Sequence, residues 1–405
     1  MRGKYFYGYY ILASCFITQG ICYGAVFTYG LFFKEFQTEF GWSRAIISGA
    51  SSLSFLIGGA LGVLAGRLND KIGPKALSVV ISILYGLAYL LLSRLRTPWQ
   101  LYLLYGLPVA LGFGAFDVIT LSTVSRWFVR NRGIMSGVVK VGTGSGQILM
   151  PLLAATLIAA YGWRNTYIIL GVIFIVLLVA AAQVMRLDPG EMGLLPDNDP
   201  YESSTPLSGS KDLGMPLREI VRTKQFWAIN LAEFCAFSCI LTVVVHIVPH
   251  AIDQGLAPGT AAGVISAIGG MSIVGRLVLG SANDRIGGKR SLMICFIILF
   301  CSFVWLQVAG SVWMFFLFAV IYGFAHGGIF TVVSPTVAEL FGTGSHGMLF
   351  GIVLFSGNIG GAISPVLAGR IFDVMGSYRI IFLLLTVVAA TGFVLISLLR
   401  PLRKP

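Results

Sequence analysis

The sequence predicts an all-α membrane protein in which twelve transmembrane helices form two repeated halves of six. Composition is the first observation: 57% of the 405 residues are hydrophobic and 11% are charged, whereas soluble proteins carry about 25% charged residues. The second is a series of apolar stretches, each long enough to cross a hydrocarbon core of about 30 Å. The third is an internal repeat in which matching residues lie 214 positions apart. Together these observations predict an integral, multi-pass membrane protein.

Apolar stretches run along the whole chain and are interrupted once by a long polar segment. They predict spans at about residues 9–33, 43–65, 76–93, 99–123, 133–159, 165–185, 226–250, 260–281, 291–308, 313–333, 346–368 and 380–399. The polar segment is rich in Pro, Gly, Ser and acidic residues, a composition typical of a flexible linker. We therefore expect an N-terminal six-helix bundle at 1–185, a cytoplasmic linker at 186–224 and a C-terminal six-helix bundle at 225–405.

The net charge of +12 follows from topology and does not predict a nucleic-acid partner. If both termini lie on one side of the membrane, the loops on that side hold 19 of the 28 Lys and Arg residues, and the opposite loops hold seven. An excess of positive charge marks cytoplasmic loops. Both termini are therefore expected to be cytoplasmic.

The two halves repeat each other in sequence. "GRLNDKIGPK" at 66–75 matches "GSANDRIGGK" at 280–289, and the same offset continues to the pair Gly162 and Gly376. Parallel six-helix repeats place a substrate site near the membrane midplane and allow alternating access by rocking of the halves. The matched loops are expected to act as cytoplasmic latches, because an aspartate can meet the positive end of a neighbouring helix or its basic residues. The latch residues are Gly66, Asp70, Lys71, Gly73, Gly280, Asp284, Arg285 and Gly287.

These two loops look like the signature loop of the major facilitator superfamily, which follows the second and eighth helices. Within it the chain resembles the monocarboxylate transporters and their bacterial oxalate/formate-type relatives. The resemblance covers nearly the full chain, through "FYGYYILASCF" (6–16), "YGLFFKEFQTEFGWSRAIIS" (29–48), "RWFVRNRGIMSGVVKVGTGSGQILMPLL" (126–153), "YGWRNTY" (161–167) and "HIVPHAIDQGL" (246–256). It implies the major facilitator fold, transport rather than enzyme activity, and a place in a bacterial cytoplasmic membrane.

Arg276 lies inside an apolar run, eight residues before Asp284, which is about 12 Å along a helix. An ionisable group at that depth is costly and predicts a functional site. Its planar guanidinium can bind a carboxylate through two hydrogen bonds; the alternative is that the side chain snorkels toward the cytoplasm. In monocarboxylate transporters an arginine on the eighth helix binds the substrate, and the resemblance implies this role for Arg276. The family often carries an acidic residue four positions earlier, where this chain has Ser272.

Four further ionisable residues lie in or beside the spans, and each has two interpretations. Lys140 either pairs with Asp117 on the neighbouring helix or makes a second contact to the anion. Asp117 either titrates during transport, because burial favours the protonated carboxyl, or hydrogen-bonds across helices. Asp253 is either a solvated acid at the outer end of the seventh helix or a proton acceptor, which the bacterial relatives imply. Glu233 poses the same choice nearer the cytoplasm.

His246 and His250 lie one turn apart on the seventh helix. Two histidines at this spacing can bind a metal, but a third ligand at suitable spacing is missing, so we predict no metal site and no cofactor. Proton handling by His250 is one interpretation, and packing or hydrogen bonding is the other.

Aromatic and polar side chains inside the spans are candidates for lining the substrate site, with core packing as the alternative. They are Tyr23 on the first helix, His326 and Phe330 on the tenth, and Phe355 and Asn358 on the eleventh. Phe27 on the first helix is a further candidate for the substrate site, and it stands where mammalian members of the family often carry a lysine.

These residues predict a secondary transporter that moves a small monocarboxylate, such as lactate or pyruvate, together with a proton. An anion would neutralise Arg276, and a proton on Asp253, Asp117 or Glu233 would let the loaded carrier cross without net charge. The alternative is anion exchange of the oxalate/formate type, in which Arg276 and Lys140 hold a dicarboxylate. A receptor or scaffold on the same fold would not need these charges. The expected partners are the organic anion, the proton and the lipid bilayer, and the expected form is a monomer.

Overall fold

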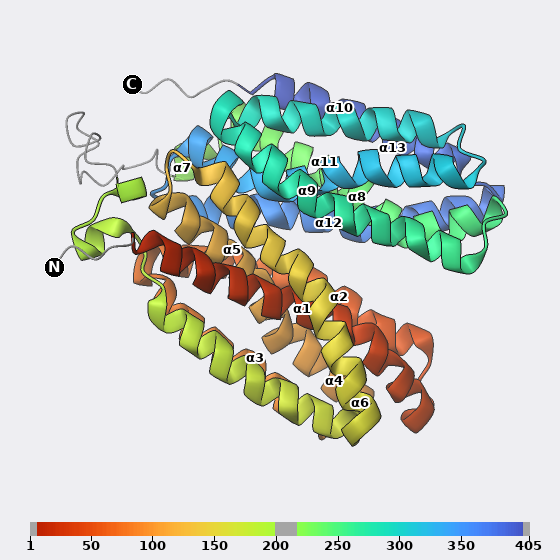
Figure 1. Cartoon of the computed structure of the whole chain (residues 1–405), viewed down its shortest axis with the longest axis horizontal. Helices are drawn as coiled ribbons and strands as arrows, with labels where there is room; N and C mark the ends of the chain where they lie inside the picture. Colours follow the sequence, from red (N-terminus) through yellow and green to blue (C-terminus); the bar gives the residue numbers. More distant parts are fainter. Residues whose placement is uncertain (1–5, 199–216, 400–405) are drawn as a thin grey trace. The chain divides into compact units, whose positions relative to one another are not determined.

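The computed structural model describes residues 6–198 and 217–399, and every regular element within these ranges is helical (Figure 1). Part of the predicted linker and several of the basic residues counted above lie outside the described residues. Two compact units divide the chain. Unit 1 comprises Met1–Arg130, Val138–Gly214 and Thr343–Ile352, and unit 2 comprises Asn131–Gly137, Met215–Gly342 and Val353–Pro405.

The first half of the chain contains α1 (Gly8–Phe40), α2 (Arg44–Ile72), α3 (Pro74–Leu92), α4 (Pro98–Leu104), the π-helical turn η1 (Tyr105–Val109), α5 (Ala110–Trp127), α6 (Arg132–Val184) and the 3-10 turns η2 (Pro189–Met192) and η3 (Pro196–Asn198). The second half contains α7 (Leu217–Ile220), α8 (Lys224–Asp253), α9 (Pro258–Ile286), α10 (Gly288–Leu306), α11 (Val312–Phe341), α12 (His346–Met375) and α13 (Arg379–Ser397).

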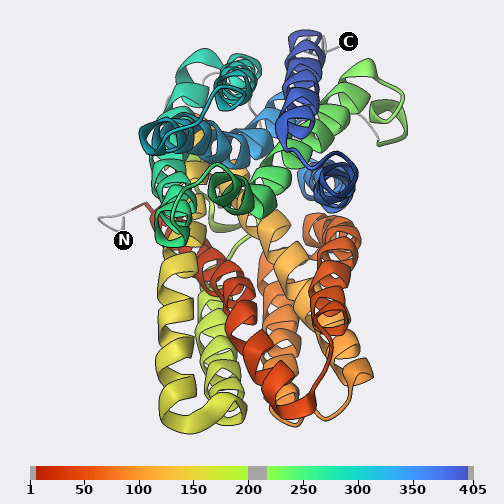
Figure 2. The ribbon, with the colours of Figure 1, turned by 90° about the vertical axis from the view of Figure 1, so that its right-hand side faces the viewer.

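The number of predicted spans agrees with the described helices. Eleven helical segments are long and apolar enough to cross a membrane, and α4, η1 and α5 together make one of them. The longest, α6, is interrupted at Gly162, whose φ of 75° is left-handed. In Figure 2 the yellow and yellow-green arms of α6 turn back on each other. With these two arms counted separately, the helices account for all twelve predicted spans.

The sequence repeat is also a repeat of helix boundaries. α2 and α9 begin and end 214 residues apart, and so do α3 and α10. The glycines that end matched helices share a left-handed backbone: φ is 80° at Gly73 and 83° at Gly287, and it is 75° at Gly162 and 63° at Gly376. A side chain is strained in this conformation, so glycine is needed where each helix turns into the next.

Local sequence explains where the helices of unit 1 begin. The Ser43 hydroxyl accepts a hydrogen bond from the backbone N–H of Ile46 at 3.3 Å and so caps α2. Thr97 and Gln100 form a capping box before α4, with Pro98 in its first turn. Pro108 lies inside η1, where its missing N–H removes one helical hydrogen bond and accounts for the local widening to a π turn.

Glycines let helices approach closely within each unit. A Cβ added to Gly114 on α5 would collide with the backbone of Gly58 on α2, and one added to Gly146 on α6 would collide with Gly20 on α1. In unit 2 a Cβ on Gly327 of α11 would meet the backbone of Ser272 on α9. Such close backbone packing holds helices together where the solvent is lipid.

The outward faces of the helices are apolar, as a lipid environment requires. Large hydrophobic side chains such as Leu64, Val176 and Val304 are exposed. Five of the six cysteines are buried, and Cys301 on α10 is exposed on such a face.

Candidate functional site

Unit 1 contains a buried ion pair between α5 and α6. Asp117 is 4% exposed and Lys140 is 2% exposed, and the Lys140 Nζ donates to Asp117 Oδ1. The Gln19 amide donates to the same oxygen at 2.8 Å, and the Tyr23 hydroxyl donates to Oδ2 at 2.8 Å. Three donors on one carboxylate, one of them charged, match the acceptor capacity of an ionised aspartate. Of the two interpretations of Lys140, the structure contains the pair with Asp117.

Further hydrogen bonds fix the side chains that surround this pair. The Gln19 amide also donates to the Thr120 hydroxyl at 2.8 Å, and its oxygen accepts from the Thr143 hydroxyl at 2.9 Å. Because α1, α5 and α6 all contribute, the network connects three helices of unit 1. The Lys140 ammonium lies over the Tyr23 ring, 5.0 Å from the centroid of that ring, and so makes a cation–π contact.

Unit 2 buries Arg276 on α9. The side chain is 3% exposed, so it does not snorkel to a lipid or water surface. Ser272, one turn earlier, is equally buried, and its backbone lies against Gly327 of α11. His326 on α11 lies within electrostatic reach of the Arg276 guanidinium. α9 therefore presents its arginine on the face that packs against α11.

An aromatic row extends along α11 beside Arg276. The His326 ring stacks on Tyr322 with centroids 5.9 Å apart and meets the edge of Phe330 at 5.2 Å. Phe330 in turn contacts Phe237 of α8 at 5.2 Å. Two of the predicted lining residues, His326 and Phe330, are therefore brought together in one apolar wall.

Glu233 on α8 is the buried acid of unit 2, with 4% exposure. A Cβ added to Gly357 of α12 would touch the Glu233 side chain at 3.0 Å, so this acid faces α12. One turn earlier, the Asn230 oxygen accepts from the Ser356 hydroxyl of α12 at 2.7 Å. Phe355 and Asn358 on α12 are half-buried.

Asp253 and His250 lie apart from these clusters, and Phe27 lies one turn after Tyr23 on the same helix. Phe27 is 48% exposed on α1, and Asp253 is exposed at the end of α8. His250 is buried among the rings of Phe315, Tyr378 and Phe382. Arg276 lies 18 residues beyond Pro258, the first residue of α9, which is about 27 Å along the helix. Asp253 and His250 precede Pro258 in the chain, whereas Asp284 lies in the last turn of α9. Asp253 and His250 are therefore at the end of unit 2 opposite Asp284.

The signature-loop aspartates cap helix N-termini. Asp70 accepts from the backbone N–H groups of Gly347 and Met348 at 3.1 and 3.0 Å, all within unit 1. Arg126 adds an ion pair at 2.6 Å. A carboxylate at the first turn of a helix satisfies free N–H groups and the positive end of the helix dipole.

Asp284 repeats this arrangement in unit 2. It accepts from Gly133 N–H at 2.5 Å and from Ile134 N–H at 2.8 Å, at the start of α6. A Cβ at Gly133 would collide with the carbonyl of Gly280, and the Gly347 and Gly66 pair repeats this close approach. The basic neighbours Lys71 and Arg285 are exposed.

Two contacts of these clusters are not predictable from the sequence pattern. Gln19 lies 98 residues from its partner Asp117, and Arg126 lies 56 residues from Asp70. The available signal was a polar amide in an apolar span for Gln19 and a charge at a span end for Arg126. Neither signal names a partner, because partners depend on how the helices pack.

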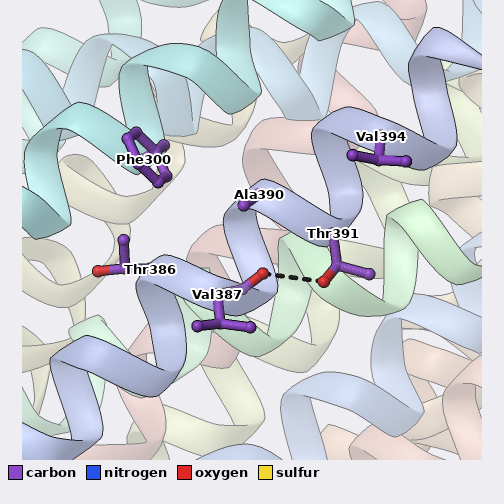
Figure 3. A pocket seen from close by; sticks show the side chains of 6 residues that line it. All are labelled: Phe300, Thr386, Val387, Ala390, Thr391 and Val394. Atoms are coloured by element: carbon purple, nitrogen blue, oxygen red, sulfur yellow. Dashed lines mark hydrogen bonds between the residues drawn. The ribbon is translucent and has the colours of Figure 1, made fainter.

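An apolar hollow of about 350 Å³ lies between α10 and α13. Figure 3 shows Phe300 facing Thr386, Val387, Ala390, Thr391 and Val394. Both threonine hydroxyls donate to carbonyls of their own helix, at 2.8 and 2.9 Å. The hollow therefore has no polar group to recognise an organic anion.

The repeated helices, the apolar outer faces and the charges buried inside both units define the class as an integral, multi-pass membrane transporter. The profile of the Major Facilitator Superfamily matches residues 15–287 and 271–405. The chain belongs to this superfamily, whose members are transporters rather than enzymes.

The chain is similar to several curated transporters. Monocarboxylate transporter 13 from Rattus norvegicus is 26% identical over 378 residues, which cover 93% of this chain and 85% of that protein. Monocarboxylate transporter 12 from Homo sapiens is 25% identical over 413 residues, covering 93% and 77%. The uncharacterized MFS-type transporter YhjX from Escherichia coli is 26% identical over 354 residues, covering 86% and 84%.

Among solved structures, the E. coli fucose:proton symporter FucP shares the fold. In its outward conformation it aligns with a TM-score of 0.73 at 15% identity, over 96% of this chain and 97% of FucP. The monocarboxylate-transporter-like family prediction and the predicted major facilitator fold are thereby confirmed.

Proposed function

We propose that this protein carries a small monocarboxylate, of the size of lactate or pyruvate, together with a proton by alternating access. The observation that carries the proposal is the buried guanidinium of Arg276, 3% exposed on α9. A buried cation is costly in a membrane protein, and a planar guanidinium binds carboxylates through paired hydrogen bonds. Relatives named monocarboxylate transporters over 93% of the chain support the same substrate class.

Charge balance in unit 2 links the anion to a proton. Among its described residues, unit 2 buries one arginine, Arg276, and one carboxylic acid, Glu233, to a similar degree. A bound carboxylate adds one negative charge to this buried set, and uncompensated buried charge is unfavourable. A proton on Glu233 restores the balance. We therefore assign the coupled proton to Glu233 rather than to Asp117, whose carboxylate is engaged by Lys140.

The alternative, exchange of oxalate- and formate-like anions, uses Lys140 as a second cation for a dicarboxylate. In the structure Lys140 is ion-paired with Asp117, which favours symport over exchange. We further propose that the monomer is the functional form, because one chain supplies both Arg276 and Glu233, and that the protein works in a bacterial cytoplasmic membrane, as the similarity to YhjX supports.

Proteoliposomes loaded with the pH indicator pyranine test the proposal. An inward lactate gradient is expected to acidify the lumen, and Arg276→Ala is expected to abolish both uptake and acidification. Lactate uptake that needs an internal anion and leaves the luminal pH unchanged would overturn symport. Uptake by Arg276→Ala at the wild-type rate would overturn the binding role.

Glu233→Gln separates proton coupling from binding. The amide imitates the protonated acid, so the variant is expected to exchange labelled for unlabelled lactate while losing acidification. Glu219→Gln, an exposed acid on α7, is the matched control and should behave as wild type. Normal acidification by Glu233→Gln would remove Glu233 from the coupling step.

A further inference from the structure

A second cavity, distinct from the surroundings of Arg276, lies at the end of unit 2 that carries Asp253. Its volume is about 410 Å³, within the range of small-molecule sites. The ends of α8, α10, α12 and α13 form its walls, which include the side chains of His250, Asp253, Tyr378, Arg379 and Phe382.

The two ends of this cavity have opposite polarity. Arg379 is the first residue of α13, so its guanidinium and the positive end of a 19-residue helix lie on one wall. Asp253 is the last residue of α8, so a carboxylate and the negative end of a helix dipole lie on another. Both side chains are exposed and described, and no ion pair joins them in the structure.

The cavity also contains a buried polar atom that needs a partner. His250 is 7% exposed, and within the described part of the chain its Nε2 makes no hydrogen bond. A buried polar atom without a partner is unfavourable, because it has lost its hydrogen bond to water and gained none in return. The aromatic rings of Tyr378 and Phe382 hold this imidazole at 5.4 and 4.8 Å.

The wall around His250 is itself fixed by hydrogen bonds. His246 Nε2 lies 2.9 Å from the carbonyl of Pro365, and its Nδ1 lies 3.2 Å from the Tyr378 hydroxyl. A carbonyl only accepts, so Nε2 donates to Pro365, and both ring nitrogens of His246 have partners. The cavity therefore has one positively charged wall, one negatively charged wall and an imidazole between aromatic rings.

We propose that this cavity is a second binding site for small carboxylates that bear a hydrogen-bond donor on the adjacent carbon, as 2-hydroxy acids and amino acids do. The carboxylate pairs with Arg379, and the hydroxyl or ammonium group donates to Asp253 or to His250 Nε2. A carboxylate without such a donor leaves the buried His250 Nε2 unsatisfied and is disfavoured. That the transported acid itself occupies this second site rests on the proposed function.

Equilibrium binding of radiolabelled L-lactate to the purified full-length protein tests the inference. The wild-type chain is expected to bind two lactates, and Arg276→Gln is expected to retain the one in the second cavity. Adding Arg379→Gln should weaken that remaining binding about tenfold, as expected for loss of a charged hydrogen-bond partner. Arg370→Gln, which changes an exposed arginine of α12 outside the cavity, is the control and should leave it unchanged.

Competition identifies the ligand chemistry. L-Lactate and L-alanine should displace the label from the Arg276→Gln protein at least about tenfold better than pyruvate, which lacks the donor. Equal displacement by pyruvate, or residual binding that Arg379→Gln does not weaken, would overturn the second site. Wild-type uptake by the Arg276→Gln protein would instead refute the proposed function, so the two failures are distinguishable.

Discussion

Among the described residues, each unit buries one carboxylic acid together with one lysine or arginine within its helices. Asp117 and Lys140 form the set in unit 1, and Glu233 and Arg276 form the set in unit 2, all between 2% and 4% exposed. Buried charges are tolerated when they are compensated. An organic anion entering beside such a set would change its charge balance, which is why the proposed function pairs the anion with a proton.

Arg276→Lys tests whether geometry or charge matters at this position. Lysine keeps the charge but cannot donate two parallel hydrogen bonds to a carboxylate. We expect kcat/KM for lactate uptake to fall about 30-fold or more, equivalent to a loss of about 2 kcal/mol or more. Concentration-dependent uptake measures the change, and Arg67→Lys on the exposed face of α2 is the control. Retained kcat/KM would mean that a point charge suffices.

The ion pair in unit 1 should behave as a coupled unit. Asp117→Asn or Lys140→Met alone leaves one buried charge, which costs about 3–5 kcal/mol. The double variant removes both charges and should be more stable than either single variant. Thermal unfolding of the purified proteins gives the comparison; additive losses in the double variant would show that the two residues act independently.

At the scale of single helices, hydropathy locates the spans but not the helix ends. The first span is predicted at 9–33, whereas α1 runs from Gly8 to Phe40. The apolar window marks the part of a helix in the hydrocarbon, while backbone hydrogen bonds extend the helix into the polar region. The break in α6 follows from Gly162, which the repeat pairs with Gly376.

The site is predictable to the same limited extent. A charge in an apolar run is visible in the sequence, so Arg276, Lys140, Asp117 and Glu233 could be selected. Their partners could not, because the contacts join helices that are distant along the chain. The hydrogen bond from Gln19 to Asp117 spans 98 residues, and no local pattern encodes it.

Close helix packing gives a prediction for α2 and α5. Gly114→Val would force a side chain into the backbone of Gly58, and overpacking of this kind costs about 1–3 kcal/mol. We expect a lower thermal unfolding temperature and a lower yield of folded protein. Gly269→Val, on α9 where an added Cβ meets nothing within 4 Å, is the control. Equal stability of the two variants would contradict the close approach of α2 and α5.

At the scale of the whole chain, the repeat is symmetric in backbone but not in charge. Asp70 and Asp284 cap equivalent helix starts, yet Asp70 has an added ion pair with Arg126. The position 214 residues after Arg126 is Leu340. The duplicated halves have therefore diverged at the side chains that surround a common scaffold.

This asymmetry predicts unequal costs for equivalent substitutions. Asp70→Asn removes the carboxylate charge from the helix terminus and from the 2.6 Å ion pair with Arg126, whereas Asp284→Asn removes it from the helix terminus and from the electrostatic reach of Arg132. Asp70→Asn should lower stability by about 1 kcal/mol more than Asp284→Asn, the value of a charged hydrogen bond. Thermal unfolding of the two variants in the same detergent measures the difference. A larger loss for Asp284→Asn would reverse the assignment.

The reactivity of the exposed Cys301 thiol reports whether lipid covers that face of the protein. The other five thiols are enclosed by protein, and the neighbours Ile297 and Val304 are exposed apolar side chains of the same helix. The cysteine thiolate is the nucleophile that attacks thiol reagents, and a charged reagent does not enter the hydrocarbon of a bilayer. Membrane-impermeant charged reagents should therefore leave the protein unmodified in intact bilayers. After a short-chain detergent has replaced the surrounding lipid, they should modify one cysteine, and mass spectrometry can count the adducts.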